Sequence, residues 1–237
     1  MIKNLMKTGF AKIGIQVHRT NRISSRRPNP IHKWDDDVIF QNIMKLVEGH
    51  TLVDIVRCYM LYQFSLQTSE LYGEVAEIGV YKGGTAMLLA KTFERSGKKI
   101  HLFDTFSGMP DTNREKDLHK QGDFSDTSLA AVNAYLCKCS NLHFHSGYFP
   151  DTASWIGNQA FAMVHVDVDI YQSVMDCMKI FYPRLVAGGV MVIDDYGFVT
   201  CPGAKQAVDE FFIDRRERPY YLPTGQCVVI KLPSVNR

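Results

Sequence analysis

Hydrophobic and polar positions from residue 73 onward alternate between two patterns. Short apolar, β-branched runs predict strands near residues 73–80, 100–104, 141–146, 161–167, 189–194 and 226–231. Segments with helical spacing lie between them and predict helices near 84–95, 126–138, 171–185 and 203–216. Because strands and helices alternate, we expect a mainly parallel sheet with helices on both faces, and therefore an α/β fold.

Two more helices are predicted ahead of the first strand. Residues 35–48 begin with acidic side chains and carry an apolar stripe, as expected for an amphipathic helix with a favourable first turn. Residues 51–67 show the same spacing, with Thr51 as the predicted N-cap and Asp54 inside the first turn.

Residues 1–33 form a basic N-terminal arm, with eight Lys or Arg and no acidic residue. Its apolar positions (Ile2, Met6, Phe10, Ile13 and Val17) predict a helix that lies on anionic lipid or packs against the body or a second subunit. Gly9 and Gly14 would weaken an isolated helix, so packing against the body or a second subunit is favoured over lying on lipid. The rest of the chain carries more acidic than basic residues, which argues against a nucleic-acid-binding protein.

Cysteine spacing and hydropathy bear on the compartment. None of the six cysteines forms a Cys-x-x-Cys pair, so we expect free thiols in a reducing compartment. No apolar run reaches the length of about 18 residues that a membrane span needs. Lys7 and Lys12 interrupt the first apolar residues, which is unlike a signal peptide. The sequence therefore predicts a cytoplasmic protein.

The stretch Tyr72–Thr85 predicts a cofactor site, because it combines a strand, a glycine turn and the start of a helix. Its glycines, Gly79 and Gly83-Gly84, do not have the Gly-x-Gly-x-x-Gly spacing of dinucleotide sites. Glu77 just before the turn would repel a pyrophosphate but suits a cationic ligand with an amino or sulfonium group. Asp104 ends the second strand and can accept hydrogen bonds from ribose hydroxyls. It therefore indicates a nucleoside but does not distinguish a cationic cofactor from NAD.

Acidic side chains follow the fourth and fifth predicted strands. Asp167 and Asp169 end one, and Asp194 and Asp195 end the other. The carboxyl ends of neighbouring parallel strands lie side by side, so these carboxylates should come together. Several negative charges in one place need a counterion, for which Mg²⁺ is the simplest candidate. We expect Asp167, Asp194 and Asp195 to be the ligands, because the strand should end before Asp169. His165 is predicted to be a core histidine.

The polar segment Thr105–Ser125 is long for a connection and is predicted to cover the substrate as a mobile loop. It contains His119, which is either a proton-transfer group or a solvent-exposed histidine.

Six motifs occur in an order that resembles the macrocin/mycinamicin O-methyltransferase family: Glu77-Ile-Gly-Val-Tyr-Lys-Gly-Gly, Asp104-Thr-Phe-Ser-Gly-Met-Pro, Gly122-Asp-Phe-Ser, Gly147-Tyr-Phe-Pro-Asp-Thr, Asp167-Val-Asp-Ile-Tyr-Gln-Ser and Val192-Ile-Asp-Asp-Tyr-Gly. The resemblance covers about residues 70–232. It departs from the family at Val168, where a glycine is usual.

The resemblance implies a Rossmann-like class I methyltransferase, with seven strands of which the last is antiparallel. Residues 34–70 would form a helical roof over a core of residues 71–237, within a methyltransferase domain of residues 34–237. The cofactors would be S-adenosylmethionine and Mg²⁺, the acceptor a sugar hydroxyl on a small molecule or glycan, and the assembly at least a dimer. The residues placed at S-adenosylmethionine are Glu77, Gly79, Gly83, Thr85, Asp104, Gly147 and Tyr148, and Asp167 would accept the proton.

Two alternatives stay open from the residues. A catechol-like diol would satisfy the same metal chemistry as a sugar. A nicotinamide-dependent oxidoreductase is disfavoured by Glu77 and by the missing glycine fingerprint.

Overall fold

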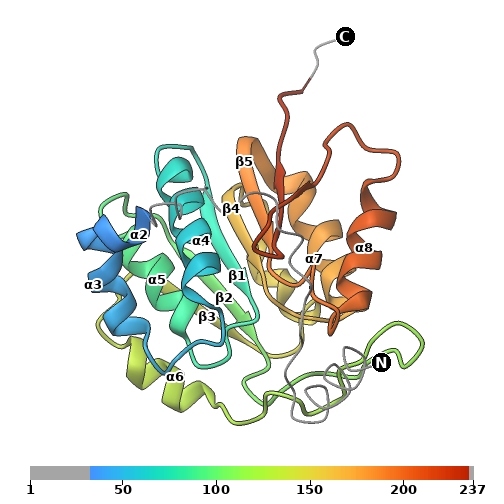
Figure 1. The fold of residues 1–237 in the computed structure, drawn as a ribbon, viewed down its shortest axis with the longest axis horizontal. Helices are drawn as coiled ribbons and strands as arrows, with labels where there is room; N and C mark the ends of the chain where they lie inside the picture. Colours follow the sequence, from blue (N-terminus) through green and yellow to red (C-terminus); the bar gives the residue numbers. More distant parts are fainter. Residues whose placement is uncertain (1–32, 235–237) are drawn as a thin grey trace, which may run out of the picture. The chain divides into compact units, whose positions relative to one another are not determined.

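The computed structural model describes residues 33–234, so the predicted basic arm lies outside the described residues except for Lys33. A seven-stranded sheet with the order β3-β2-β1-β4-β5-β7-β6 forms the centre of the described part (Figure 1). Strands β1 to β5 pair in parallel, whereas β7 pairs antiparallel with both β5 and β6. This confirms the expected class, including the antiparallel last strand. The strands are β1 (Glu74–Ile78), β2 (Ile100–Asp104), β3 (Leu142–Ser146), β4 (Phe161–Val166), β5 (Leu185–Ile193), β6 (Tyr220–Tyr221) and β7 (Cys227–Ile230).

Helices cover both faces of the sheet and bury its alternating side chains. On one face, Val75 belongs to an apolar cluster with α3, α4, α5 and α6; on the other, Ala76 belongs to a cluster with α7 and α8. The helices are α2 (Lys33–Asp36), α3 (Val38–Val47), α4 (Ile55–Thr68), α5 (Gly84–Thr92), α6 (Leu129–Leu136), α7 (Tyr171–Phe181) and α8 (Pro202–Phe212), with short 3₁₀ helices η1 (Asp151–Ile156) and η2 (Tyr182–Arg184).

Helix α4 begins later than predicted, and Thr51 is not its N-cap. The N-cap is Asp54, whose carboxylate accepts hydrogen bonds from the backbone N–H groups of Val56 and Arg57 at 2.9 and 3.1 Å. Two N–H groups of the first turn are thereby satisfied by a charged acceptor, which the Thr51 hydroxyl could not match. The predicted helix of residues 35–48 is likewise divided, because Asp37 caps α3 at the N–H of Phe40.

Other differences lie at element ends. Helix α7 ends at Phe181, four residues early, and Pro183 falls in the 3₁₀ turn that follows. Strand β6 was not predicted, because its two residues are too few to show a period. Among residues 33–234, no helix has the length and apolarity needed to cross a bilayer.

The strand order reverses between β1 and β4, which are neighbours although β2 and β3 come between them in sequence. Chain connections leave such a point in opposite directions and open a crevice at the carboxyl ends of the strands. Asp104 and the acidic residues after β4 and β5 belong to this edge.

Candidate cofactor and metal site

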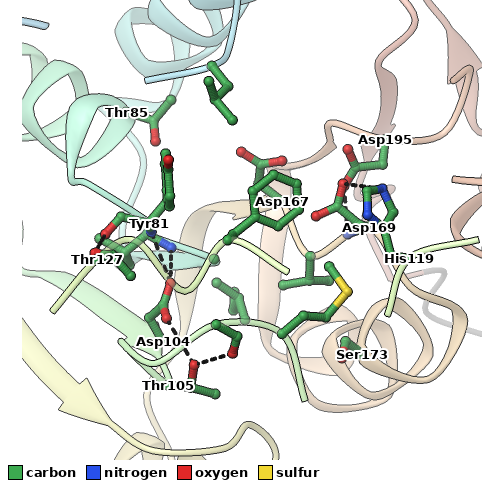
Figure 2. A pocket seen from close by; sticks show the side chains of 18 of the residues that line it. Tyr81, Thr85, Asp104, Thr105, His119, Thr127, Asp167, Asp169, Ser173 and Asp195 are labelled. Carbon is green, nitrogen blue, oxygen red and sulfur yellow. Dashed lines mark hydrogen bonds and ion pairs between the residues drawn. The ribbon is translucent and has the colours of Figure 1, made fainter. Parts of the chain in front are cut away.

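A cavity of about 330 Å³ opens at the carboxyl ends of the parallel strands (Figure 2). Its walls come from the segment before α4, the turn after β1, the long loop after β2, and the exits of β3, β4 and β5. The lining includes five residues that the sequence placed at the cofactor, namely Gly79, Thr85, Asp104, Gly147 and Tyr148. A crevice built from several strand ends is the usual ligand site of open α/β sheets.

Asp104 is held in place by backbone N–H groups. Its Oδ2 accepts from Val80 at 2.6 Å and Tyr81 at 3.0 Å, and its Oδ1 accepts from Phe106 at 2.6 Å. A carboxylate offers about four acceptor positions, and the Thr105 hydroxyl lies 3.5 Å from Oδ1 beside these three bonds. The turn after β1 and the tip of β2 are therefore joined through the side chain that the sequence assigned to a ribose.

Gly79 allows the turn after β1 to approach the exit of β4. Its φ is +87°, and an added Cβ would lie 1.8 Å from the carbonyl oxygen of Asp167. A side chain at this position is excluded both by the backbone conformation and by the neighbouring strand.

Glu77 and Gly83 were also assigned to the cofactor, but neither lines the cavity. Glu77 is fully buried, and its Oε1 accepts a hydrogen bond from His165 Nδ1 at 2.9 Å. Burial lowers the pKa of His165, but Asp194 and Glu77 together raise it to about 10, which favours the protonated form of the imidazole. Gly83 is the N-cap of α5, and an added Cβ would meet side chains of α6.

The three predicted metal ligands do come together. Oxygen atoms of Asp167, Asp194 and Asp195 lie within 4.8 Å of one another. Burial, followed by the charge of Asp194, raises the pKa of Asp167 well above its usual value. Burial, followed by the charges of Asp169 and Asp167, does the same for Asp195. Asp167 and Asp195 line the cavity, whereas Asp194 does not.

Asp194 is fully buried and already paired. It forms an ion pair with Arg57 of α4, and its Oδ1 accepts from Gln226 Nε2 at 2.8 Å. Although burial raises its pKa, His165 and Arg57 outweigh burial and keep the pKa below the usual value. Asp194 is thus held by Arg57 and Gln226 and lies outside the cavity lining.

Sequence reasoning missed Arg57 and left His119 undecided. Arg57 lies within the predicted roof helix, and its side chain is only 13% exposed. The excess of acidic residues at the strand ends was the available signal that a cation should lie nearby. His119 is not solvent-exposed, since its side chain is 19% exposed and lines the cavity beside Asp169 and Cys201. No periodicity in the long loop marks this placement.

Comparison with known proteins identifies relatives. The macrocin O-methyltransferase family (TylF) matches residues 47–218. Mycinamicin III 3''-O-methyltransferase of Micromonospora griseorubida is 30% identical over 181 residues, which are 69% of this chain and 70% of that protein.

Solved structures share the fold. The O-methyltransferase NovP aligns with a TM-score of 0.69 at 23% identity, over 78% of this chain and 84% of NovP. An O-methyltransferase from Bacillus cereus, solved in complex with SAH, aligns with a TM-score of 0.55 at 12% identity, over 84% of this chain and 96% of that one. At these identities the alignments show a common fold.

Proposed function

Because the chain belongs to the macrocin O-methyltransferase family, we propose that it methylates a sugar hydroxyl with S-adenosylmethionine as donor and with the help of Mg²⁺. The acceptor would be a sugar on a glycosylated natural product or a polysaccharide precursor. The relative named for mycinamicin III supports this acceptor class, and the Bacillus cereus structure with SAH supports the donor.

The observation that carries the metal proposal is an imbalance of charge at the strand ends. Carboxyl groups outnumber cationic side chains there, because Glu77, Asp167, Asp169, Asp194 and Asp195 gather around Arg57 and His165. The raised pKa values of Asp167 and Asp195 reflect this crowding together with burial. Buried charge of one sign is costly unless it is compensated. A divalent cation supplies the missing charge.

The donor atoms fit Mg²⁺. Asp167 and Asp195 present oxygen atoms to the cavity, and Asp194 stands behind them. Hard carboxylate ligands with solvent on one side are what Mg²⁺ prefers, because it keeps part of its water shell. When bound there, the cation lowers the pKa of an acceptor hydroxyl and orients it. Arg57 and Gln226 hold Asp194 so that its position does not depend on the ion.

For the cofactor, we propose that Asp104 binds the ribose and that Gly147 and Tyr148 border the adenine. Gly79 and Thr85 complete the wall beside the methyl donor. Glu77 and Gly83 act indirectly: Glu77 holds the cationic His165, and Gly83 caps α5.

Asp167 is the proposed proton acceptor. The hydroxyl oxygen attacks the methyl carbon in line, the carbon–sulfur bond breaks as the carbon–oxygen bond forms, and the proton passes to Asp167. No covalent enzyme intermediate is needed, so the chain accelerates transfer by positioning two substrates and excluding water. Phe124 and Phe198 contribute apolar surface to this cavity.

All six cysteines are free thiols, which supports the proposal that the protein works in a reducing cytoplasm. We also propose a homo-oligomer by family resemblance, which light scattering on the purified protein measures directly.

The test is methyl transfer from labelled S-adenosylmethionine to a panel of nucleotide sugars, glycosylated natural products and catechols. We expect label on a sugar hydroxyl, loss of transfer after chelation, and recovery with Mg²⁺. Transfer that survives chelation would remove the metal from the proposal, and transfer to catechols alone would overturn the acceptor class. Reduction of NAD instead of methyl transfer would overturn the reaction.

A further inference from the structure

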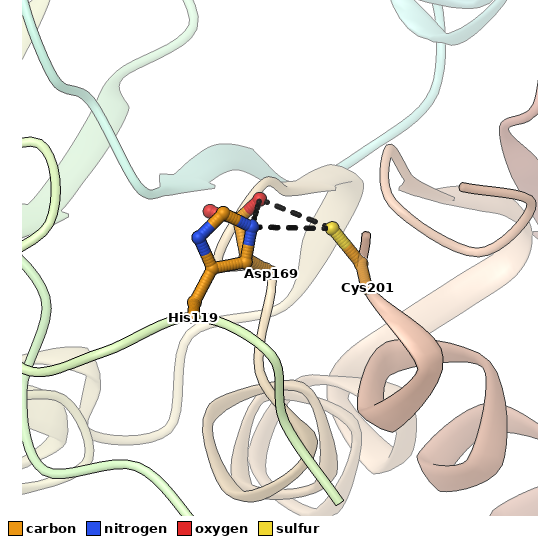
Figure 3. A group of neighbouring side chains, drawn as sticks. All are labelled: His119, Asp169 and Cys201. Carbon is orange, nitrogen blue, oxygen red and sulfur yellow. Dashed lines mark hydrogen bonds and ion pairs between the residues drawn. The ribbon is translucent and has the colours of Figure 1, made fainter. Parts of the chain in front are cut away.

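A second group of metal-binding side chains lines the cavity next to the three carboxylates. His119 comes from the loop between β2 and α6, Asp169 follows β4, and Cys201 directly precedes α8. Figure 3 shows the three side chains converging. We propose that they bind a borderline-soft divalent cation such as Zn²⁺, which ties the long loop to the exits of β4 and β5.

The spacing of the donor atoms suits a shared ion, although the two contacts of Cys201 Sγ are also within hydrogen-bond distance for sulfur. His119 Nε2 lies 3.7 Å from Asp169 Oδ1 and 3.7 Å from Cys201 Sγ, while Cys201 Sγ lies 3.4 Å from Asp169 Oδ1. A nitrogen–oxygen distance of 3.7 Å is too long for a hydrogen bond. The circle through the three atoms has a radius of about 2.1 Å, close to the bond lengths of zinc to nitrogen and oxygen and slightly short of that to sulfur.

A second observation concerns the other side of the imidazole. His119 Nδ1 lies 3.2 Å from Asp123 Oδ2, which also accepts the backbone N–H of Lys120 at 3.0 Å. Metal-binding histidines commonly donate their second ring N–H to a carboxylate, which fixes the ring and directs the free nitrogen at the ion. Asp123 therefore leaves Nε2 of His119 free to bind and turns it toward Asp169 and Cys201.

The donor set differs in kind from the carboxylate cluster. Nitrogen, sulfur and a single carboxylate oxygen select a zinc-like ion, whereas three carboxylates select Mg²⁺. Cys201 would bind as the thiolate, and its proton would leave to solvent. Three protein ligands leave one position open, and because all three residues line the cavity, that position faces it.

Such an ion would fix the wall of the cavity. Met109 and Phe124 lie on the same loop as His119 and line the same space. Tying His119 to Asp169 and Cys201 would hold these apolar side chains in the wall of the cavity. The proposal stands apart from methyl transfer, because it rests on side chains to which the proposed reaction gives no role.

The test is a Co²⁺ titration of the full-length protein after chelation and dialysis, because a cobalt–thiolate bond gives a charge-transfer absorption band. We expect one equivalent of Co²⁺ to produce this band and excess Zn²⁺ to abolish it. Cys201→Ser should remove the band, and His119→Gln should weaken binding by at least about 100-fold. Asp123→Asn should weaken it by about 10-fold, because Asp123 contacts the second ring nitrogen of His119 and orients the imidazole.

Cys137→Ser is the matched control, because Cys137 is exposed and outside the cluster. It should keep the band, and so should Asp167→Asn. Circular dichroism establishes that each variant is folded, and His119→Gln provides an independent test if Cys201→Ser does not fold. Absence of the band in the wild-type protein, its survival in folded Cys201→Ser, or an unchanged Co²⁺ affinity of folded His119→Gln would each overturn the proposal.

Discussion

Gly79→Ala is expected to destabilise the protein strongly, because two costs fall on one position. An alanine with φ near +87° costs about 1–2 kcal/mol relative to glycine. Its Cβ would also lie 1.8 Å from the carbonyl oxygen of Asp167, so the β4 exit would have to retreat by more than about 1 Å. Overpacking of this kind adds about 1–3 kcal/mol, which gives a total loss of about 2–5 kcal/mol.

Gly49→Ala separates the two costs. Gly49 has φ of +77°, and an added Cβ meets nothing within 4 Å, so only the backbone cost of about 1–2 kcal/mol applies. Urea denaturation followed by fluorescence measures both free energies of unfolding, and calorimetry with S-adenosylhomocysteine measures cofactor binding. Gly79→Ala should also bind the cofactor more weakly, since the turn and Asp167 must move apart.

Equal destabilisation by the two substitutions, together with unchanged cofactor affinity, would refute this reasoning. It would mean that the turn after β1 does not press against the β4 exit, and the proposed geometry of the site would be lost with it.

Three further predictions concern charge. Asp104→Asn should weaken S-adenosylhomocysteine binding by about 10–100-fold, measured by calorimetry, because an amide cannot accept all three backbone N–H bonds. Asp167→Asn and Asp194→Asn should each abolish turnover in the labelled-methyl assay but leave that affinity within about threefold; near-normal activity would exclude the metal. Burial, followed by His101 and His143, lowers the pKa of His145 to about 4. Between about pH 6.5 and 4, His145 is therefore protonated in the unfolded chain but not in the folded one, so unfolding takes up a proton. As the pH is lowered through this range, the free energy of unfolding of the wild-type protein should fall by roughly 1–2 kcal/mol more than that of His145→Gln, a figure reduced because His145 is partly exposed. If the free energy of unfolding had the same pH dependence in both proteins, the lowered pKa of His145 would be contradicted.

The sequence was sufficient for the parallel strands, because their apolar runs are separated by segments with helical spacing. The antiparallel last strand was implied by the family resemblance, and the two-residue strand β6 was not predicted. The sequence also brought Asp167, Asp194 and Asp195 together correctly, since parallel strands place their carboxyl ends along one edge. These inferences depend on topology and need no side-chain orientation.

The direction in which a side chain points could not be predicted from the sequence. Glu77 alternates with its neighbours along β1, but the pattern does not show that its carboxylate turns to His165 and not to the cavity. The sequence pattern placed Asp54 inside the first turn of a helix capped by Thr51, and only the hydrogen-bond geometry shows that Asp54 is the cap of α4.

Unusual backbone conformations could not be predicted from the sequence either. Tyr81, Phe124 and Asp169 line the cavity with φ between +51° and +60°, which non-glycine residues seldom adopt. Such conformations persist where surrounding contacts enforce them, often at functional sites. Tertiary packing brings His119 beside Asp169, and no local sequence pattern in the loop predicts this contact.

The most direct test of the account is an anomalous difference map from crystals grown with S-adenosylhomocysteine and Mn²⁺ in place of Mg²⁺. We expect the ribose at Asp104 and one manganese peak within bonding distance of Asp167 and Asp195. Cofactor bound elsewhere, or full cofactor occupancy with no manganese at these carboxylates, would contradict the account.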